Sequence, residues 1–491
     1  MGNDTTRPRV LLVGAYERDN FGDLLFLLQT EQYLTHADVT AAAPFPGDMT
    51  RLLDRKIPAF GPLLEKQAYD CVWTVGGEVG GTSFGGAFRM SNPAGVVRAY
   101  DAASPEEQDD IVRRLSGRTP LEGPYLPRPT AYPPNAATPS VVHSAGVASI
   151  AGLSHAMQAE RLQALKEADR ITVRDEMSAD LLAAHGIPHQ LGPDLVHTLA
   201  MTRPQVRPAE PDVALVQVSD PHLRKVGHEA FAEALARSTN LAPYRIRMFV
   251  AGTAPGHDSV ESYERIVEHV RKIVPDRNIA ISPARRPLDL VDEIAAAGLW
   301  IGLSLHGRIV ASAYEVPRIS LEKRKLDVYS QTWDAEMPYG VTPETLDDAV
   351  AEALSPAVIA RAGTVGEDLA RAADEDVRAA VAAALCGEGC SPAAVRTRVA
   401  RRVIALESWR SDQAARLADQ VQERDRTITS LRERLTASDE RRTFAESIAS
   451  RPSVADRLVD GSLRRVRALR QHVGRSLPLN RKGSRRVSSG S

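Results

Sequence analysis

The stretch LWIGLSLHGRIVASAYEVPRISL, residues 299–321, decides the fold. Its apolar run at 299–303 predicts a strand, 308–314 fits a helix, and 318–321 predicts a second strand. Two strands joined by a helix are typical of a parallel sheet with helices packed on its faces. His306 and Arg308 stand where the first strand gives way to the helix.

The same alternation of apolar runs and helical patterns extends away from this stretch in both directions. Further strands are predicted at 10–13, 71–75, 141–145, 171–173, 213–218, 246–251 and 279–282. Helices are predicted at 23–34, 155–166, 177–184, 223–236, 259–274 and 288–297. Proline crowding predicts an irregular loop at 120–139 and a linker at 204–211. The sequence therefore predicts an α/β protein with an N-terminal domain at 1–205 and a second domain at 211–355.

The region 356–450 has no strand pattern and predicts a long helical extension. Apolar residues at coiled-coil spacing run through part of it for about three heptads, interrupted by Arg424. They are Ala414, Leu417, Val421, Ile428, Leu431 and Leu435. Two interpretations stay open: a short coiled coil that would support a homo-oligomer, and a single surface helix packed on the body.

Charge is distributed unevenly along the 491 residues, although the net charge is only −2. The segment 451–491 holds eleven basic and two acidic residues, a net of +9, which leaves −11 for the preceding 450 residues. Leucine and valine stripes among the arginines of this tail fit a helix lying on an anionic membrane surface. A basic disordered tail is the alternative. No nucleic-acid partner is expected.

Three cysteines, Cys71, Cys386 and Cys390, are too few for a disulfide framework, so a reducing compartment is expected. The first residues lead directly into an apolar strand, and no run of 18 apolar residues occurs. We therefore expect a cytoplasmic protein that contacts the inner membrane face peripherally through its tail. No metal site and no cofactor are expected, because the CxxxC lacks further ligands nearby.

Two glycine-containing loops follow predicted strands of the first domain. One ends in Asn20-Phe21-Gly22-Asp23, where a starting helix directs free N–H groups into the loop. The other is Gly76-Gly77-Glu78, at the carboxyl end of a strand, where α/β sheets bind their ligands. A tight turn explains the first loop equally well, and a mobile loop without function is the alternative for the second.

Cationic side chains follow three other predicted strands. Arg174 comes after 171–173, His306 and Arg308 after 299–303, and Lys323 and Lys325 after 318–321. An arginine fork at a strand end can grip a carboxylate or phosphate, and a histidine there can deliver a proton. For Arg174 the alternative is a salt bridge, and for His306 a structural role.

Taken together, these elements resemble the polysaccharide pyruvyltransferase family. The resemblance rests on Asn20 to Asp23, on Gly76-Gly77-Glu78, on Arg174-Asp175 with Ser178, and on Leu305-His306 followed by Val316-Pro317. It covers about residues 9 to 330 and reaches neither the helical extension nor the tail.

The resemblance implies two facing Rossmann-like domains, similar to GT-B glycosyltransferases. It also implies transfer of the enolpyruvyl group of phosphoenolpyruvate to a sugar diol of a cell-surface glycan or its lipid-linked precursor, forming a pyruvate ketal. His306 would then be the general acid, with Arg174, Arg308 and Lys325 binding the donor. Asn20 and Asp23 would face the acceptor across the cleft, near the loop of Gly76, Gly77 and Glu78.

Two positions depart from the family pattern. Ser304 stands where the family has an arginine before Leu-His, and Glu78 stands where it has a third glycine. The first removes an expected contact to the donor carboxylate, and the second adds a negative charge near an anionic donor. Two alternatives therefore stay open: a GT-B glycosyltransferase using a nucleotide sugar, and a catalytically altered scaffold in surface-polysaccharide assembly.

Overall fold

The computed structural model describes residues 7–206, 208–209, 211–385 and 391–449. The chain divides into two compact units, Met1–Trp409 and Arg410–Ser491. Cys386, Cys390 and the basic segment 451–491 lie outside the described residues. Within those residues, none of the helices combines the length and hydropathy that crossing a bilayer requires.

The first lobe of the larger unit is built on a parallel six-stranded sheet of order β2-β1-β5-β6-β7-β8. Its strands are β1 (Arg9–Val13), β2 (Asp38–Ala42), β5 (Cys71–Val75), β6 (Ser140–Ala145), β7 (Arg170–Val173) and β8 (Gln190–Leu191). A small antiparallel pair, β3 (Gly47–Asp48) and β4 (Lys56–Ile57), lies apart from it. Every residue of β5 and β6 is buried. Burial on both faces explains why these strands are continuous apolar runs in the sequence.

Nine helices accompany this sheet among the described residues. They are α1 (Phe21–Tyr33), α2 (Thr50–Leu53), α3 (Phe60–Lys66), α4 (Phe84–Ser91), α5 (Ala94–Ala102), α6 (Pro105–Ser116), α7 (His155–Glu167), α8 (Glu176–Ala184) and α9 (Leu199–Thr202). The expected irregular loop at 120–139 contains only the short 3-10 turns η1 (Pro129–Ala131) and η2 (Pro133–Asn135). Two further 3-10 turns, η3 (Ala148–Gly152) and η4 (Leu195–Thr198), follow β6 and β8.

The second lobe has a parallel five-stranded sheet of order β11-β10-β9-β12-β13. Its strands are β9 (Val213–Gln217), β10 (Arg245–Met248), β11 (Ile279–Ile281), β12 (Leu299–Gly302) and β13 (Arg318–Ser320). Its helices are α10 (Asp220–Val226), α11 (His228–Arg237), α12 (Val260–Ile273), α13 (Pro287–Ala295), α14 (Leu305–Ala313), α15 (Arg324–Trp333) and α16 (Leu346–Ala353), with the 3-10 turn η5 (Pro343–Thr345). Two parallel sheets flanked by helices confirm the predicted α/β class with two Rossmann-like domains.

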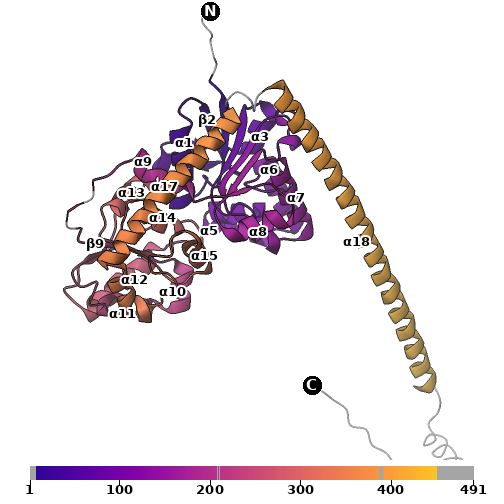
Figure 1. Ribbon diagram of the computed structural model, residues 1–491. Coiled ribbons are helices and arrows are strands. Elements are labelled where there is room, and N and C mark those ends of the chain that lie inside the picture. Colours follow the sequence, from indigo (N-terminus) through magenta and orange to yellow (C-terminus); the bar gives the residue numbers. More distant parts are fainter. Residues whose placement is uncertain (1–6, 207, 210, 386–390, 450–491) are drawn as a thin grey trace, which may run out of the picture. The chain divides into compact units, whose positions relative to one another are not determined.

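Helix α17 (Pro356–Leu385) ties the two lobes together (Figure 1). Its first half buries Val358 and Ala362 in the core of the second lobe, and its second half buries Val377 and Ala380 against the first. Asp376 on this helix accepts a hydrogen bond of 2.6 Å from the side chain of Arg170, the first residue of β7. The sequence pattern predicts a domain boundary at 355/356, whereas packing divides the chain after Trp409, because α17 belongs to the cores of both lobes.

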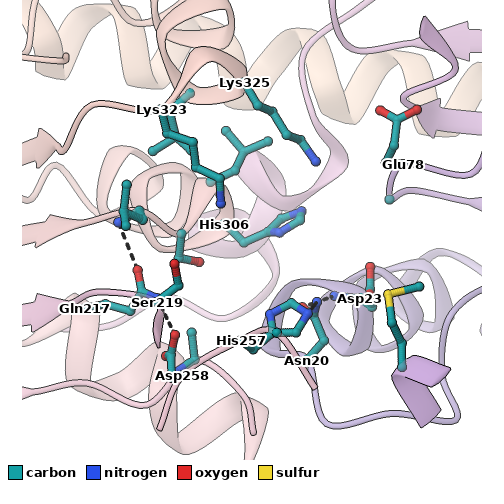
Figure 2. Close-up of a pocket in the computed structure, with 18 of the residues that line it drawn as sticks. Asn20, Asp23, Glu78, Gln217, Ser219, His257, Asp258, His306, Lys323 and Lys325 are labelled. Carbon is teal, nitrogen blue, oxygen red and sulfur yellow. Dashed lines mark hydrogen bonds between the residues drawn. The ribbon is translucent and has the colours of Figure 1, made fainter. Parts of the chain in front are cut away.

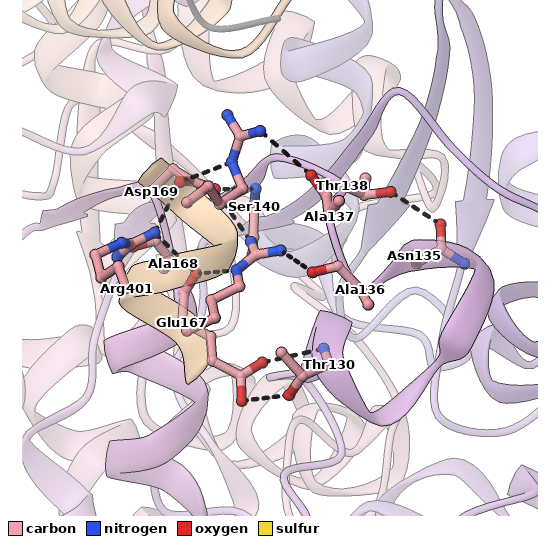
Figure 3. Close-up of polar contacts among 12 residues, drawn as sticks. Thr130, Asn135, Ala136, Ala137, Thr138, Ser140, Glu167, Ala168, Asp169 and Arg401 are labelled. Atoms are coloured by element: carbon pink, nitrogen blue, oxygen red, sulfur yellow. Dashed lines mark hydrogen bonds and ion pairs between the residues drawn. The ribbon is translucent and has the colours of Figure 1, made fainter. Parts of the chain in front are cut away.

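The last long helix, α18 (Pro392–Ala449), begins on the first lobe (Figure 3). Arg398, Arg401 and Arg402 reach backbone carbonyl oxygens beyond η2 and at the C-terminus of α7, including Ala136 and Ala168. All three also donate to the carboxylate of Asp169, at 2.7 to 3.1 Å. The cations thus satisfy carbonyl groups that a helix end leaves unpaired.

Candidate active site

The carboxyl ends of both sheets face one cavity of about 290 Å3 (Figure 2). Its walls come from the loops after β1, β5 and β7 of the first lobe and after β9, β10, β12 and β13 of the second. Loops at the carboxyl ends of parallel strands are where α/β proteins bind ligands. The site therefore depends on the two lobes meeting.

The loop after β1 contributes Arg18, Asn20 and Asp23. Asn20 caps α1, because its Oδ1 accepts hydrogen bonds from Gly22 N at 3.0 Å and Asp23 N at 3.4 Å. Arg18 donates to Asp23 Oδ2 from Nε and Nη2, at 3.0 and 2.8 Å. Burial opposes ionisation of Asp23, but the charge of Arg18 outweighs it and lowers the Asp23 pKa. The predicted residues Asn20 and Asp23 both line the cavity. Asn20 Oδ1 and Asp23 Oδ2, however, already accept hydrogen bonds from this same loop and helix start.

The glycine loop after β5 requires its glycines for conformational reasons. Gly76 and Gly77 have φ of +65° and +72°, and a Cβ on Gly76 would meet the ring of Phe26. Gly77 and Glu78 line the cavity, whereas Gly76 does not. Glu78 accepts a hydrogen bond from the Ser149 hydroxyl, which fixes its carboxylate.

The polar residues of the motif after β7 make different contacts and have different roles. Asp175 caps α8 by accepting from Ser178 N at 2.8 Å, and the Ser178 hydroxyl accepts from the N–H groups of Val147 and Ala148. Arg174 is only 1% exposed and donates from Nη1 to Asp194 at 2.8 Å. Its buried Nη2 has no hydrogen-bond partner among the described residues. Asp175 and Ser178 thus hold the loops in place. The Nη2 group of Arg174 remains available to donate a hydrogen bond to a ligand.

His306 lies in the first turn of α14, at the centre of the site (Figure 2). Its Nε2 is 3.4 Å from Arg174 Nη1 and 3.7 Å from Asp194 Oδ2, and its ring meets Phe26 edge-on at 4.9 Å between centroids. A Cβ on Gly22 would come within 1.8 Å of Nδ1, so the glycine of Asn20-Phe21-Gly22-Asp23 makes room for this ring. Burial lowers the His306 pKa, although Asp194 works in the opposite direction.

Two lysines bring positive charge to the same wall. Lys323 and Lys325 follow β13 and line the cavity. Both keep solvent-exposed surface. Burial of the ammonium group, assisted by the charge of Arg174, lowers the Lys325 pKa to about 8, and burial also lowers that of Lys323. At neutral pH Lys325 is therefore still mostly protonated.

Arg308 is not brought to the cavity. Its guanidinium donates to the Asp334 carboxylate at 2.7 Å, to the Ser320 hydroxyl at 3.1 Å, and to three backbone carbonyl oxygens. At 1% exposure it forms a buried cluster with Asp334 and Arg318. The structure therefore gives Arg308 structural partners, and it offers no support for the expected contact with a donor.

Sequence reasoning missed several residues that line the cavity: Arg18, Gln217, Ser219, His257 and Asp258. Asp258 accepts from Ala251 N and from Gln217 Nε2, each at 2.7 Å, and burial raises its pKa to about 7. The available signal was position, since Arg18 follows the predicted strand 10–13, Gln217 and Ser219 lie at the end of 213–218, and His257 and Asp258 follow 246–251. No motif distinguished them from ordinary loop residues.

Among the residues that the structure describes, no group of three or more histidine, cysteine, aspartate or glutamate side chains is arranged to hold a metal ion. The polar character of the cavity comes instead from buried ion pairs and free cationic groups.

A family model described as polysaccharide pyruvyl transferase matches residues 20–322 of the chain. No curated protein sequence gives a significant match.

Solved structures with a similar fold are remote in sequence. UDP-GlcNAc 2-epimerase from Methanocaldococcus jannaschii is 12% identical, with a TM-score of 0.41 over 74% of this chain and 98% of that one. The corresponding epimerase from Neisseria meningitidis is 11% identical, with a TM-score of 0.43 over 76% and 99%. Sucrose-phosphate synthase from Thermosynechococcus elongatus is 15% identical, with a TM-score of 0.39 over 76% and 97%.

Proposed function

The chain belongs to the polysaccharide pyruvyl transferase family, and we propose that it transfers the enolpyruvyl group of phosphoenolpyruvate to a sugar diol. The product is a pyruvate ketal on a cell-surface glycan or its lipid-linked precursor, and inorganic phosphate is released. We propose that the reaction takes place in the cytoplasm, without metal or cofactor.

The observation that carries this proposal is the convergence of cations around His306. Arg174 offers a buried Nη2 that has no hydrogen-bond partner among the described residues, and Lys323 and Lys325 line the same cavity. Phosphoenolpyruvate carries a carboxylate and a phosphate, and charge-assisted hydrogen bonds are the strong way to hold such groups. Arg18 does not add to this set in the same way, because Asp23 neutralises it. We assign Arg174 and the two lysines to donor binding.

His306 is the proposed general acid. The methylene carbon of the donor must gain a proton before the central carbon becomes electrophilic. Burial lowers the His306 pKa and favours the neutral ring, whereas the negative charge of a bound donor favours its protonated form. His306 then transfers that proton to the methylene carbon, which becomes the methyl group of the ketal.

Ser304 lies on the cavity wall in place of the family's arginine. Its hydroxyl accepts from Gly307 N at 3.2 Å and caps α14. We propose that Lys323 supplies the carboxylate contact that this arginine would make. Serine at position 304 is therefore compatible with enolpyruvyl transfer, because the positive charge for the donor carboxylate comes from Lys323 in the loop after β13.

The test is acceptor-dependent phosphate release from phosphoenolpyruvate by the full chain, with p-nitrophenyl hexosides as acceptors. His306→Asn should lower the rate by about 100-fold or more, whereas His185→Asn, at an exposed position outside the cavity, should not. Phosphoenolpyruvate should raise the melting temperature of the wild type.

Two results would contradict the proposal. Stabilisation by nucleotide sugars alone would favour a nucleotide-sugar glycosyltransferase. An unchanged cellular glycan phenotype in His306→Asn would favour the catalytically altered scaffold.

A further inference from the structure

A second cavity of about 350 Å3 adjoins the central one. The two share Glu78, Arg174, Leu305 and Lys325, which line both. A donor held by Arg174 and Lys325 would therefore border the second cavity as well. A second substrate could reach the donor from there without entering the central cavity.

The second cavity differs from the first in chemical character. Its floor is apolar, with Met177 of α8 and Val328 and Tyr329 of α15. Met177 is 41% exposed, and the Tyr329 ring is fixed because its hydroxyl meets His197 Nε2 at 2.9 Å. The carboxylates of Glu78 and Asp175 line it too, and they face the basic residues Arg174, Arg324 and Lys325 on its rim, so charged groups of both signs border the apolar surface. Apolar surface with a few placed hydrogen-bonding groups suits the C–H faces and hydroxyl groups of a sugar.

We propose that this second cavity binds the acceptor sugar and that Glu78 accepts the proton of the sugar hydroxyl that attacks the donor. This inference rests on the proposed function. Asn20 and Asp23, which the family resemblance implied would face the acceptor, are less suited to that task. Asn20 Oδ1 caps α1, and Asp23 Oδ2 holds Arg18.

Glu78 has the placement that a base needs. It lies on the wall between the two cavities, and the Ser149 hydroxyl orients its carboxylate through Oε1. No described cation lies within ion-pair distance of this carboxylate, so its capacity to accept a proton is not spent on a salt bridge. The glutamate that departs from the family's glycine pattern therefore acquires a specific task here.

The hydroxyl oxygen bonds to the central carbon of the donor as Glu78 takes the hydroxyl proton, while the methylene carbon takes a proton from His306. The second hydroxyl then attacks the same carbon, and phosphate leaves with the electron pair of its C–O bond. One of the two hydroxyl protons replaces the one that His306 gave, and the other leaves with phosphate.

The first test is Glu78→Gln in the full chain, which keeps the shape and removes the base. The rate of phosphate release with p-nitrophenyl hexosides should fall by about 100-fold. Affinity for phosphoenolpyruvate alone, measured by calorimetry, should stay the same or increase, because a negative charge near the donor is removed. Glu176→Gln, at an exposed position beside the cavity, is the matched control. An unchanged rate in Glu78→Gln would overturn the assignment of the base.

The second test is Met177→Asp, which puts a charge on the apolar floor. An aspartate in the first turn of α8 suits the helix dipole, so the fold should tolerate it. The KM for the hexoside should rise by roughly tenfold or more, with donor affinity unchanged. Met201→Asp, at a methionine of α9 that is 51% exposed and outside both cavities, is the control.

The outcomes separate the two proposals. A wild type that neither binds phosphoenolpyruvate nor releases phosphate would refute the proposed function, and with it the subsite. A wild type that does both, together with an unchanged hexoside KM in Met177→Asp, would refute the subsite alone.

Discussion

Arg174 and Arg308 show how the same residue type serves two purposes a short distance apart. Both are about 1% exposed and both bind a buried aspartate. Arg308 uses its remaining donors on the Ser320 hydroxyl and on backbone carbonyl groups, whereas Arg174 Nη2 has no described partner. A buried donor without a partner carries a desolvation cost, which a bound anion would offset.

Arg308→Ala should therefore destabilise the fold without weakening donor binding. Removing one member of a buried ion cluster costs about 3–5 kcal/mol, measurable as a shift in chemical denaturation. The folded fraction should bind phosphoenolpyruvate with wild-type affinity. Arg237→Ala, which breaks an exposed i,i+4 pair with Glu233, should cost less than about 0.5 kcal/mol. Lost donor affinity at unchanged stability would mean that Arg308 touches the donor after all.

Donor affinity should fall as the pH rises through about 8, the pKa of Lys325. Above that pH the ammonium loses its proton and its charge, so phosphoenolpyruvate binding should weaken by at most about tenfold per pH unit. In Lys325→Arg the charge persists to high pH, so the decline between pH 7 and 9 should be shallower than in the wild type. Calorimetric titrations across this range check the expectation, and an identical slope in both proteins would assign the titration to another group.

At the scale of the elements, Asp169 is the anchor for the start of α18 (Figure 3). Asp169→Ala leaves Arg398, Arg401 and Arg402 without their shared carboxylate. Because hydrogen bonds to charged groups contribute about 1.5–3 kcal/mol each, amide exchange in residues 392–409 should speed up markedly. Asp110→Ala, which removes an exposed partner of Arg113, should leave that exchange unaltered. Unchanged protection in Asp169→Ala would show that apolar packing alone holds the helix.

The part of α18 beyond Trp409 carries an unusual set of exposed apolar residues. Val421, Leu431 and Leu435 are 56%, 54% and 64% exposed, at the coiled-coil spacing seen in the sequence. A long isolated helix gains little from propensity alone, so packing of an apolar stripe is its usual source of stability. We propose that a second copy of the chain covers this stripe.

A homodimer is therefore expected at micromolar concentration, as measured by light scattering. Leu431→Glu combined with Leu435→Glu should shift the protein to monomer, because two charges would face the partner helix. Thr436→Glu, next to the stripe but outside it, should not. A wild type that stays monomeric would remove the coiled-coil interpretation and leave a single helix.

At the scale of the whole molecule, charge separates the chain into an acidic body and a basic tail. The tail at 451–491 has a net charge of +9 and lies outside the described residues. Basic residues near an anionic membrane contribute about 1 kcal/mol each. The full chain should therefore sediment with vesicles containing phosphatidylserine, and a variant lacking 451–491 should not.

This binding should weaken with added salt, and neutral phosphatidylcholine vesicles serve as the control. Equal sedimentation of the full chain and the truncated variant would show that the tail does not cause membrane binding. Membrane attachment would bring the active site to the surface where lipid-linked glycans are found.

The sequence by itself determined the α/β class, the position of most strands and the loops from which site residues come. These features follow from local causes. Buried parallel strands must be continuous apolar runs, and ligand-facing loops follow the carboxyl ends of strands. Position at strand ends singled out Arg174, His306 and the loop of Asn20 and Asp23, all of which lie on the cavity, and the family resemblance implied their roles.

Only the tertiary structure decided which of these residues face a ligand. Whether an arginine is free depends on its tertiary partners. Asp334 and Ser320 occupy Arg308, whereas Arg174 binds Asp194 and keeps an Nη2 with no partner in the part of the chain that the structure describes. His257 and Asp258 carried no motif and joined the site because the two lobes meet there. The packing of α17 across both lobes likewise depends on surfaces that no local pattern describes. Burial, ion pairing and pKa are properties of a three-dimensional neighbourhood, and that neighbourhood exists only once the lobes have packed together.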